Sequence, residues 1–230
     1  MKILAVGNER ILAKFREKFA GSSQDAPLDY HFFSETADIA EELTSAEVVF
    51  DFTLDEEPEN IELYLEHDHL LVFCNMPKMS LAEVQYYNPE IACMLVRFNG
   101  LPTFLNRPLL EVSLLEESAR ERVEAVGKVL GTEIAVVADR VGMATPRVIC
   151  MIINEAFYTV QEGTASREDI DLGMKLGTNY PYGPFEWCER IGVGQVYELL
   201  EAMYEDTKDE RYKICPLLKH EYLKAQKFEA

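Results

Sequence analysis

The stretch Asn179–Val193, NYPYGPFEWCERIGV, holds two prolines, two glycines and four aromatic rings in fifteen residues. Pro184 can occupy the first position of a helix, and Gly192 can end that helix. Phe185 and Trp187 can anchor it in an apolar environment. The pattern predicts a rigid, buried corner between two helices, either in the core of a domain or against another subunit.

The sequence before this corner also has a helical pattern. From Thr145, apolar residues recur on one face of a long predicted helix, and no strand-like run follows. Ser166, three residues before Asp169, is placed to cap a second helix, and Gly177 is placed to end it in a left-handed conformation. Residues 141–230 are therefore expected to form an all-helical domain.

Residues 1–140 alternate between strand-like and helix-like segments. Helices are expected at 34–43, capped by Ser34, at 56–67 and at 116–130, and strands are expected at 2–6, 30–33, 46–54, 69–75, 92–100, 107–115 and 133–139. Such alternation predicts parallel pairing with right-handed crossovers. The expected class is α/β: a shortened, Rossmann-like, mostly parallel sheet followed by the helical domain.

Composition restricts the partners that this chain can bind. The 230 residues are 48% hydrophobic and carry a net charge of −19, which disfavours nucleic acids and anionic membranes. No apolar run approaches the length of a membrane span, and the N-terminus lacks a signal-peptide pattern. The five cysteines form no C-x-x-C pair, and His67, Asp68 and His69 are interpreted as a polar turn. We expect a cytoplasmic protein without a metal site.

Several motifs in the second half occur together in one known family. They are Asn154-Glu155-Ala156, Glu162-Gly163-Thr164-Ala165-Ser166, Asp169-Ile170-Asp171, Pro181-Tyr182-Gly183-Pro184-Phe185 and Ile191-Gly192. In this order and spacing, the run Asp139–Val193 resembles the start of the helical C-terminal domain of the 3-hydroxyacyl-CoA dehydrogenases. The resemblance implies NAD as cofactor, an acyl-CoA ligand and a homodimer formed through the helical domain.

The resemblance also assigns positions to the catalytic chemistry, which needs a base for the hydroxyl proton and a carboxylate to orient it. Glu111 matches the orienting carboxylate, as a relic, and Asn75 and Asn99 match substrate-facing residues. Val96 stands where the family has its histidine. Two further polar positions of the family are occupied here by Pro77 and Pro146.

The predicted cofactor loop is incomplete. A dinucleotide site uses three glycines so that the backbone can approach the pyrophosphate. This chain offers Gly7 and Asn8, followed by Glu9, which places negative charge near the phosphate position. The acid that would bind the ribose could only be Glu35. NAD is therefore expected to bind weakly or not at all.

Two hypotheses about function remain open. In the first, the chain is a working 3-hydroxyacyl-CoA dehydrogenase that has replaced its catalytic groups. In the second, it is a degenerate member with impaired or lost catalysis, which keeps the fold, the dimer and an acyl-CoA-binding or protein-interaction role. The missing histidine and glycines favour the second.

Overall fold

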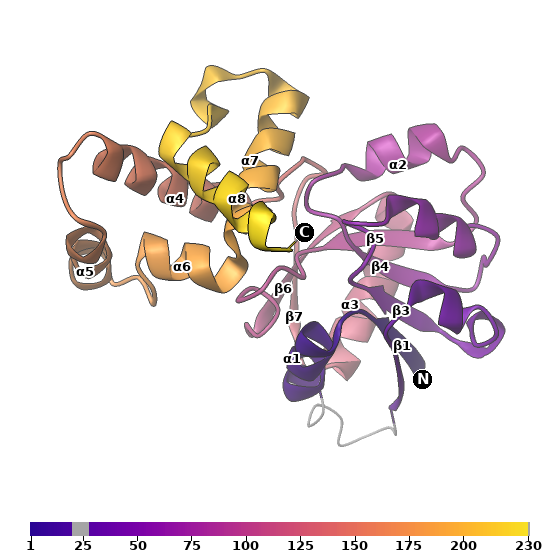
Figure 1. Cartoon of the computed structure of the whole chain (residues 1–230). Coiled ribbons are helices and arrows are strands. Elements are labelled where there is room, and N and C mark those ends of the chain that lie inside the picture. Colours follow the sequence, from indigo (N-terminus) through magenta and orange to yellow (C-terminus); the bar gives the residue numbers. More distant parts are fainter. Residues whose placement is uncertain (20–27, 230) are drawn as a thin grey trace. The chain divides into compact units, whose positions relative to one another are not determined.

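The chain divides into two units, Met1–Met143 and a second unit that begins at Ala144, and the computed structural model describes residues 1–19 and 28–229 (Figure 1). The first unit contains one seven-stranded sheet, with the order β2-β1-β3-β4-β5-β6-β7. The strands are β1 (Lys2–Val6), β2 (Asp29–Phe33), β3 (Val48–Asp51), β4 (Leu71–Asn75), β5 (Met94–Phe98), β6 (Leu109–Leu114) and β7 (Glu133–Val136).

All neighbouring strands pair in parallel except β5 and β6, which are antiparallel. The predicted class, a mostly parallel α/β sheet followed by helices, is confirmed. The strands that pair in parallel are dominated by buried aliphatic and aromatic residues, as expected for a sheet covered on both faces.

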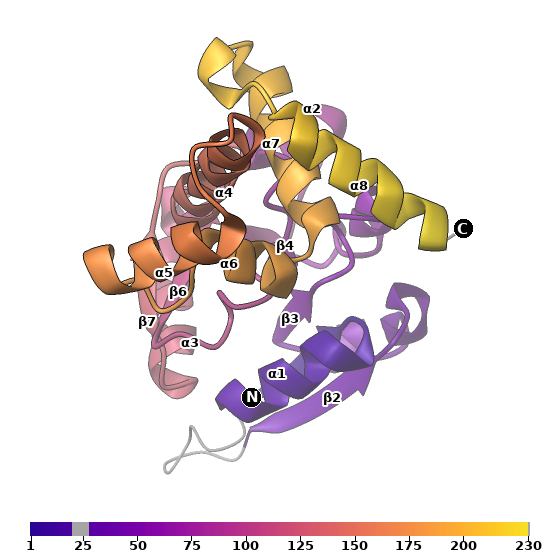
Figure 2. The ribbon, with the colours of Figure 1, turned by 60° about the vertical axis from the view of Figure 1, so that its left-hand side comes forward.

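The two faces of the sheet carry separate apolar layers. One face packs against α1 (Glu9–Phe19) and α3 (Arg120–Val129), and it contains many phenylalanine rings. The other face is covered by α2 (Leu81–Tyr87) and three 3-10 helices, η1 (Thr36–Ile39), η2 (Leu43–Ser45) and η3 (Pro58–Leu63). A further 3-10 turn, η4 (Glu117–Ala119), precedes α3. Figure 2 shows α1 alongside β2, where Arg16 lies 4.2 Å above the ring of Phe32.

Two predicted α-helices are wrong, because the crossovers on this second face are 3-10 turns. Ser34 does not cap a helix; η1 begins after Glu35, whose side chain makes no capping bond. In η3, Ile61 and Tyr64 are buried three residues apart, and this spacing matches the three-residue period of a 3-10 helix. The sequence analysis also missed α2, which starts with a capping box formed by Ser80 and Glu83.

The second unit is helical throughout its described residues. Its helices are α4 (Thr145–Gln161), α5 (Arg167–Thr178), α6 (Pro184–Ile191), α7 (Val193–Thr207), η5 (Glu210–Tyr212) and α8 (Pro216–Glu229). Across the described residues, no helix combines the length and the apolar character that a membrane crossing requires.

The predicted corner forms as expected around α6. Pro184 is in the first turn of α6, and Gly192 ends the helix with a φ of 106°. Phe185 and Trp187 are 6% and 2% exposed, so both rings lie in the core of this unit. Of the two alternatives, burial in the domain core is the one that the structure adopts for these two rings.

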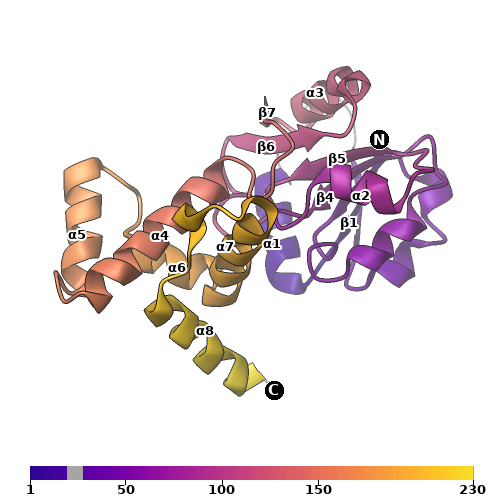
Figure 3. The same ribbon diagram turned by 90° about the horizontal axis from the view of Figure 1, so that it is seen from above.

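Helix α5 is attached mainly by polar contacts, and Figure 3 shows it at the end of α4. None of its residues is buried. Asp171 accepts hydrogen bonds from the backbone N–H groups of Phe185 (2.8 Å) and Glu186 (3.1 Å). Ser166 caps α5 as predicted, but Gly177 does not end it, because the left-handed residue is Asn179.

Candidate functional site

The candidate site is the edge of the sheet where the parallel strands β1, β3, β4 and β5 end. In open α/β sheets, ligands bind at this edge, at the point where the strand order reverses. Here β1 leads to β2 on one side and is paired with β3 on the other, so the reversal lies between β1 and β3. The residues that follow these two strands are Gly7 and Phe52.

The side chain of Phe52 occupies the space beside Gly7. A Cβ atom placed on Gly7 would lie 2.8 Å from Ile11 Cγ2 and 3.1 Å from Phe52 Cβ. The ring of Phe52 extends toward the end of β5, since a Cβ on Gly100 would lie 2.9 Å from two of its atoms. Phe52 is 8% exposed, and its ring contacts that of Phe98 at 5.1 Å. The glycines at this edge therefore make room for a phenylalanine of the chain itself.

Asp51, which the sequence analysis did not single out, fixes the backbone around Phe52. Its carboxylate accepts hydrogen bonds from the Thr53 backbone N–H (2.7 Å), the Thr53 hydroxyl (2.7 Å) and the Tyr64 hydroxyl (2.6 Å). Burial raises the pKa of Asp51, and these donors oppose the rise. The network holds the turn after β3 and with it the direction of the Phe52 side chain.

The predicted cofactor residues, Gly7 and Asn8, serve the local fold. The Gly7 N–H donates to the carbonyl of Phe33 (3.0 Å), and Asn8 Oδ1 accepts from the N–H of Ile11 (3.1 Å). A backbone N–H group at the start of α1, of the kind that binds phosphate in nucleotide sites, is thus occupied by a side chain of the protein. Glu9 is exposed and pairs with Arg16 at 2.7 Å. Glu35, the proposed ribose acid, is also exposed.

The two predicted substrate residues, Asn75 and Asn99, are buried, with 7% and 3% exposure. Asn75 Oδ1 accepts from the Gly100 N–H at 2.9 Å, and Asn99 Oδ1 accepts from the Leu101 N–H at 3.4 Å. The structure brings both residues to the end of β5, as predicted. There, both side chains hold the loop that follows the strand.

Glu111 lies on β6, 6% exposed, in a polar cluster centred on Arg97. Arg97 is fully buried; it pairs with Asp139 at 2.9 Å and donates to Ser113 Oγ at 3.4 Å. Burial lowers the pKa of Arg97, and the carboxylates of Asp139, Glu83 and Glu111 oppose this effect. Glu111 therefore shares a face of the sheet with a buried cation. The sequence analysis missed Arg97, although a charged residue inside the strand MLVRF was a visible signal.

Position 96 lies on the opposite face of the sheet. Val96 is fully buried in the phenylalanine-rich layer with Phe98 and Val112, whereas Glu111 alternates with Val112 along β6 and faces the other way. A side chain at position 96 could not form a hydrogen bond with Glu111. In the continuing β5–β6 register, the residue opposite Glu111 is Asn99, whose N–H donates to the Glu111 carbonyl at 3.1 Å.

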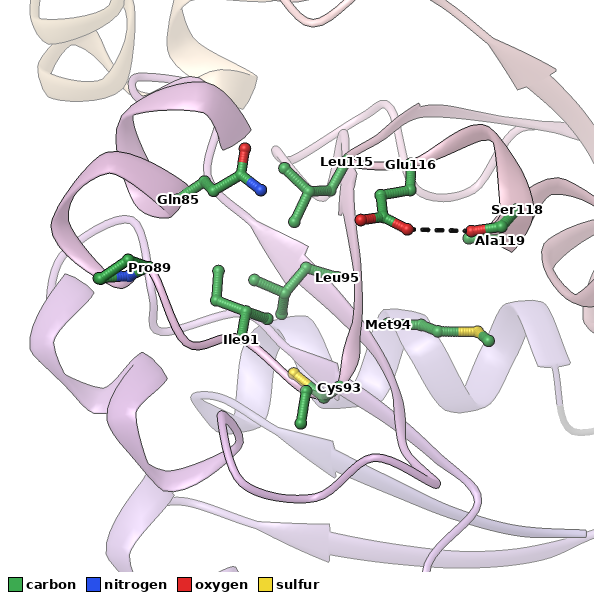
Figure 4. Close-up of a pocket in the computed structure, with 11 residues that line it drawn as sticks. Gln85, Pro89, Ile91, Cys93, Met94, Leu95, Leu115, Glu116, Ser118 and Ala119 are labelled. Atoms are coloured by element: carbon green, nitrogen blue, oxygen red, sulfur yellow. Dashed lines mark hydrogen bonds between the residues drawn. The ribbon is translucent and has the colours of Figure 1, made fainter.

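A hollow of about 180 Å³ lies at the other end of β5 (Figure 4). Glu116 is the one charged side chain that lines it, and it accepts a hydrogen bond from Ser118 at 3.2 Å. Burial raises the pKa of the lining Cys93 to about 12, so this thiol stays protonated near neutral pH. The hollow offers no nucleophile with a base. Across the described residues, no group of three His, Cys, Asp or Glu side chains is arranged to hold a metal ion.

Comparison with solved structures supports the fold. The crystal structure of (S)-3-hydroxybutyryl-CoA dehydrogenase PaaH1 from Ralstonia eutropha superposes with a TM-score of 0.74, covering 97% of this chain and 94% of that one at 20% identity. The likeness defines the class of this protein: a Rossmann-like α/β unit followed by a helical unit, as in dehydrogenases of this type.

Sequence comparison identifies the family. Residues 142–230 match the model of the 3-hydroxyacyl-CoA dehydrogenase C-terminal domain. The 3-hydroxyadipyl-CoA dehydrogenase of Escherichia coli (strain K12) is 41% identical over 100 residues, which are 44% of this chain and 21% of that protein. The 3-hydroxybutyryl-CoA dehydrogenase of Bradyrhizobium diazoefficiens is 36% identical over 129 residues, 53% of this chain and 44% of that protein. The chain belongs to the 3-hydroxyacyl-CoA dehydrogenase family through its helical domain, and it spans less than half the length of either relative.

Proposed function

We propose that this chain is a degenerate 3-hydroxyacyl-CoA dehydrogenase that binds an acyl-CoA without oxidising it. The single observation that carries the proposal is the Phe52 side chain packed against Gly7 at the reversal of strand order. The relatives named above act on CoA thioesters according to their names. The helical unit, where the family match lies, is the part that this chain shares best with them.

The residues at the edge do not fit the dinucleotide that the family uses. Pyrophosphate needs close backbone approach and free N–H groups at a helix start. Gly7 instead faces Ile11 and Phe52, and Asn8 occupies an N–H group of α1. The exposed Glu9 adds negative charge beside this helix start. We therefore propose that NAD binds weakly or not at all, and no step of chemistry is derived through it.

The missing base supports the loss of catalysis. Removal of a general base typically costs about 10²–10⁴ in rate. Val96 can accept no proton, and Glu111 lies across the sheet from it beside Arg97. Glu111 is left with a structural electrostatic role in the polar cluster of Arg97.

Two assays test this proposal. Isothermal titration calorimetry should show binding of acetoacetyl-CoA and no measurable heat with NADH. Acetoacetyl-CoA reduction followed by NADH absorbance should give no turnover above that of a buffer blank. Turnover near the roughly 1–10³ per second common to enzymes, and abolished by Glu111→Gln, would show a working enzyme with a replaced base and would refute the proposal.

We also propose a homodimer through the helical unit, with α5 at the interface. Because Phe185 and Trp187 are buried within the unit, they are not available to a partner. The apolar side chains that stay exposed include Leu172 and Leu176 of α5, 53% and 78% exposed, and a Cβ on Gly173 would meet nothing within 4 Å. Large exposed apolar residues next to small ones are suited to close helix contact.

Light scattering on the intact protein tests the dimer. The wild type should give twice the chain mass of 26.3 kDa, and Leu176→Glu should give the mass of one chain. Leu223→Glu on α8, where the leucine is 49% exposed, is the matched control and should leave the dimer intact. A wild-type mass of one chain across the micromolar range would refute the dimer.

A cytoplasmic location is proposed from the cysteines. All five, Cys74, Cys93, Cys150, Cys188 and Cys215, are buried free thiols, as expected for a protein that stays in a reducing compartment.

A further inference from the structure

A strained turn follows β5 at the same edge of the sheet. The N–H of Phe104 donates to the carbonyl of Leu101 at 3.1 Å, and Pro102 and Thr103 are the central residues of the turn. Thr103 has a φ of 77°. Proline followed by a positive φ is the pattern of a type II turn, in which glycine or asparagine is the usual residue at the second central position.

Threonine is a poor residue for this conformation. Its branched Cβ makes positive φ more costly than for other residues, so the position counts as a genuine outlier. The other non-glycine residues with positive φ in the described chain are Met143, Asn179 and Lys208, and none of them is β-branched. The packing of Leu101, at 3% exposure, and Phe104, also at 3%, holds the turn in place on both sides of Thr103.

The hydroxyl group of Thr103 carries a second cost. Its Oγ1 atom is buried and has no hydrogen-bond partner among the described residues. A buried hydroxyl without a partner is unfavourable, and such a group calls for an explanation. Glycine at this position would remove both the strain and the unpaired hydroxyl. Strain of this kind is typical of ligand sites, where it serves the bound state.

The place of Thr103 in the fold suggests what that ligand is. The turn begins two residues after Asn99, at the carboxyl end of a sheet strand, where α/β proteins bind ligands. The side chain as a whole is half-buried, so rotation about its Cα–Cβ bond can exchange the hydroxyl with the methyl group. A neutral hydroxyl is suited to a neutral oxygen, such as a carbonyl or hydroxyl oxygen of an acyl chain.

We propose that Thr103 contacts the ligand, and that its hydroxyl forms a hydrogen bond with an oxygen of the acyl group of a 3-oxoacyl- or 3-hydroxyacyl-CoA. This inference rests on the acyl-CoA binding proposed above. It adds the residue that distinguishes an oxygen-bearing acyl chain from CoA alone.

Three variants of the intact protein separate the hydroxyl from the strain. Thr103→Val keeps the shape and removes the hydroxyl, Thr103→Ser keeps the hydroxyl, and Thr103→Gly removes both the hydroxyl and the strain. Titration calorimetry measures the Kd for acetoacetyl-CoA and for CoA, and differential scanning calorimetry measures the Tm of the unliganded protein.

Thr103→Val should raise the Kd for acetoacetyl-CoA about tenfold, the value of one hydrogen bond, and leave the Kd for CoA unchanged. Thr103→Ser should bind like the wild type. Thr103→Gly should weaken binding as Thr103→Val does and yet raise the Tm of the unliganded protein, because it relieves strain.

Two results would overturn the inference while leaving acyl-CoA binding intact: an unchanged Kd for acetoacetyl-CoA in Thr103→Val, or a lower Tm of unliganded Thr103→Val, which would show that the hydroxyl has a structural partner. A wild-type protein that binds neither compound would refute the proposed function, and the role of Thr103 with it.

Discussion

Replacement of Trp187 by alanine should destabilise the helical unit by about 3–5 kcal/mol, the usual cost of removing a buried aromatic side chain. The indole is 2% exposed, and it packs against the rings of Tyr180 (5.4 Å) and Tyr182 (6.1 Å). Collapse into the cavity is restricted, because Pro181 and Pro184 fix the backbone angles on either side of the corner. We therefore expect a cost in the upper half of this range.

Trp187→Phe is the matched control for this substitution. The indole Nε1 is buried and has no hydrogen-bond partner in the described part of the chain. A buried donor without a partner costs about 1–3 kcal/mol, and phenylalanine removes it while filling much of the same space. The loss of contacts and the relief of the donor should nearly offset each other, so the net cost should stay below about 1.5 kcal/mol.

Urea unfolding followed by far-ultraviolet circular dichroism measures both costs. Trp187 is the only tryptophan, so the variants cannot be followed by indole fluorescence, whereas wild-type fluorescence reports unfolding of the helical unit. An alanine variant that loses less than about 1 kcal/mol would show that the corner does not depend on this ring. A phenylalanine variant as unstable as the alanine variant would refute the role assigned to Nε1.

Other substitutions test the polar contacts. Asp171→Ala should cost about 1–2 kcal/mol and should speed hydrogen exchange in α5, because it removes the acceptor of two N–H groups of α6 (2.8 and 3.1 Å); unchanged exchange in α5 would contradict this. Gly183→Ala should destabilise the same contact, since its Cβ would lie 2.2 Å from Asp171 Cγ, and a neutral result in thermal unfolding would refute that packing. Arg97→Met should cost about 3 kcal/mol in urea unfolding, because it leaves Asp139 without its buried counter-charge; a stabilised variant would show that the ion pair is dispensable. Burial lowers the pKa of Lys18 to about 8 from 10.5, so the unfolded chain binds more protons between these values, and the stability of the wild type relative to Lys18→Met should rise as pH increases through this window; a flat difference between the two unfolding curves would contradict the shift.

The strands of the first unit could be predicted from the sequence, because short runs of aliphatic and aromatic residues determine them locally. The crossovers could not be predicted in the same way. The segments 34–43 and 56–67 have helix-compatible residues, yet they fold as 3-10 turns in which Ile39 and Ile61 are buried against the sheet. This choice depends on contacts with β3 and β4, which are distant in sequence or separated by a turn.

The candidate site shows the same division. The incomplete glycine loop and the missing histidine are visible in the sequence, since they are single residues at recognisable positions. The position of Phe52 beside Gly7 required the structure, because the two residues are 45 positions apart and meet only when β1 pairs with β3. The neighbourhood of Arg97, Glu111 and Asp139 likewise exists only after three segments pack together.

By itself, the sequence determined the class of the protein, its family and the helical corner around α6, because each depends on local patterns or on motifs in a fixed order. The tertiary structure decided which face each side chain occupies and what fills the edge of the sheet. A strand turns successive side chains to opposite faces, so the separation of Val96 from Glu111 follows from the alternation along β5 and β6 and from the pairing of the two strands. The strain at Thr103 belongs to the same level, since only the packing of Leu101 and Phe104 on either side of it holds a threonine at a φ of 77°.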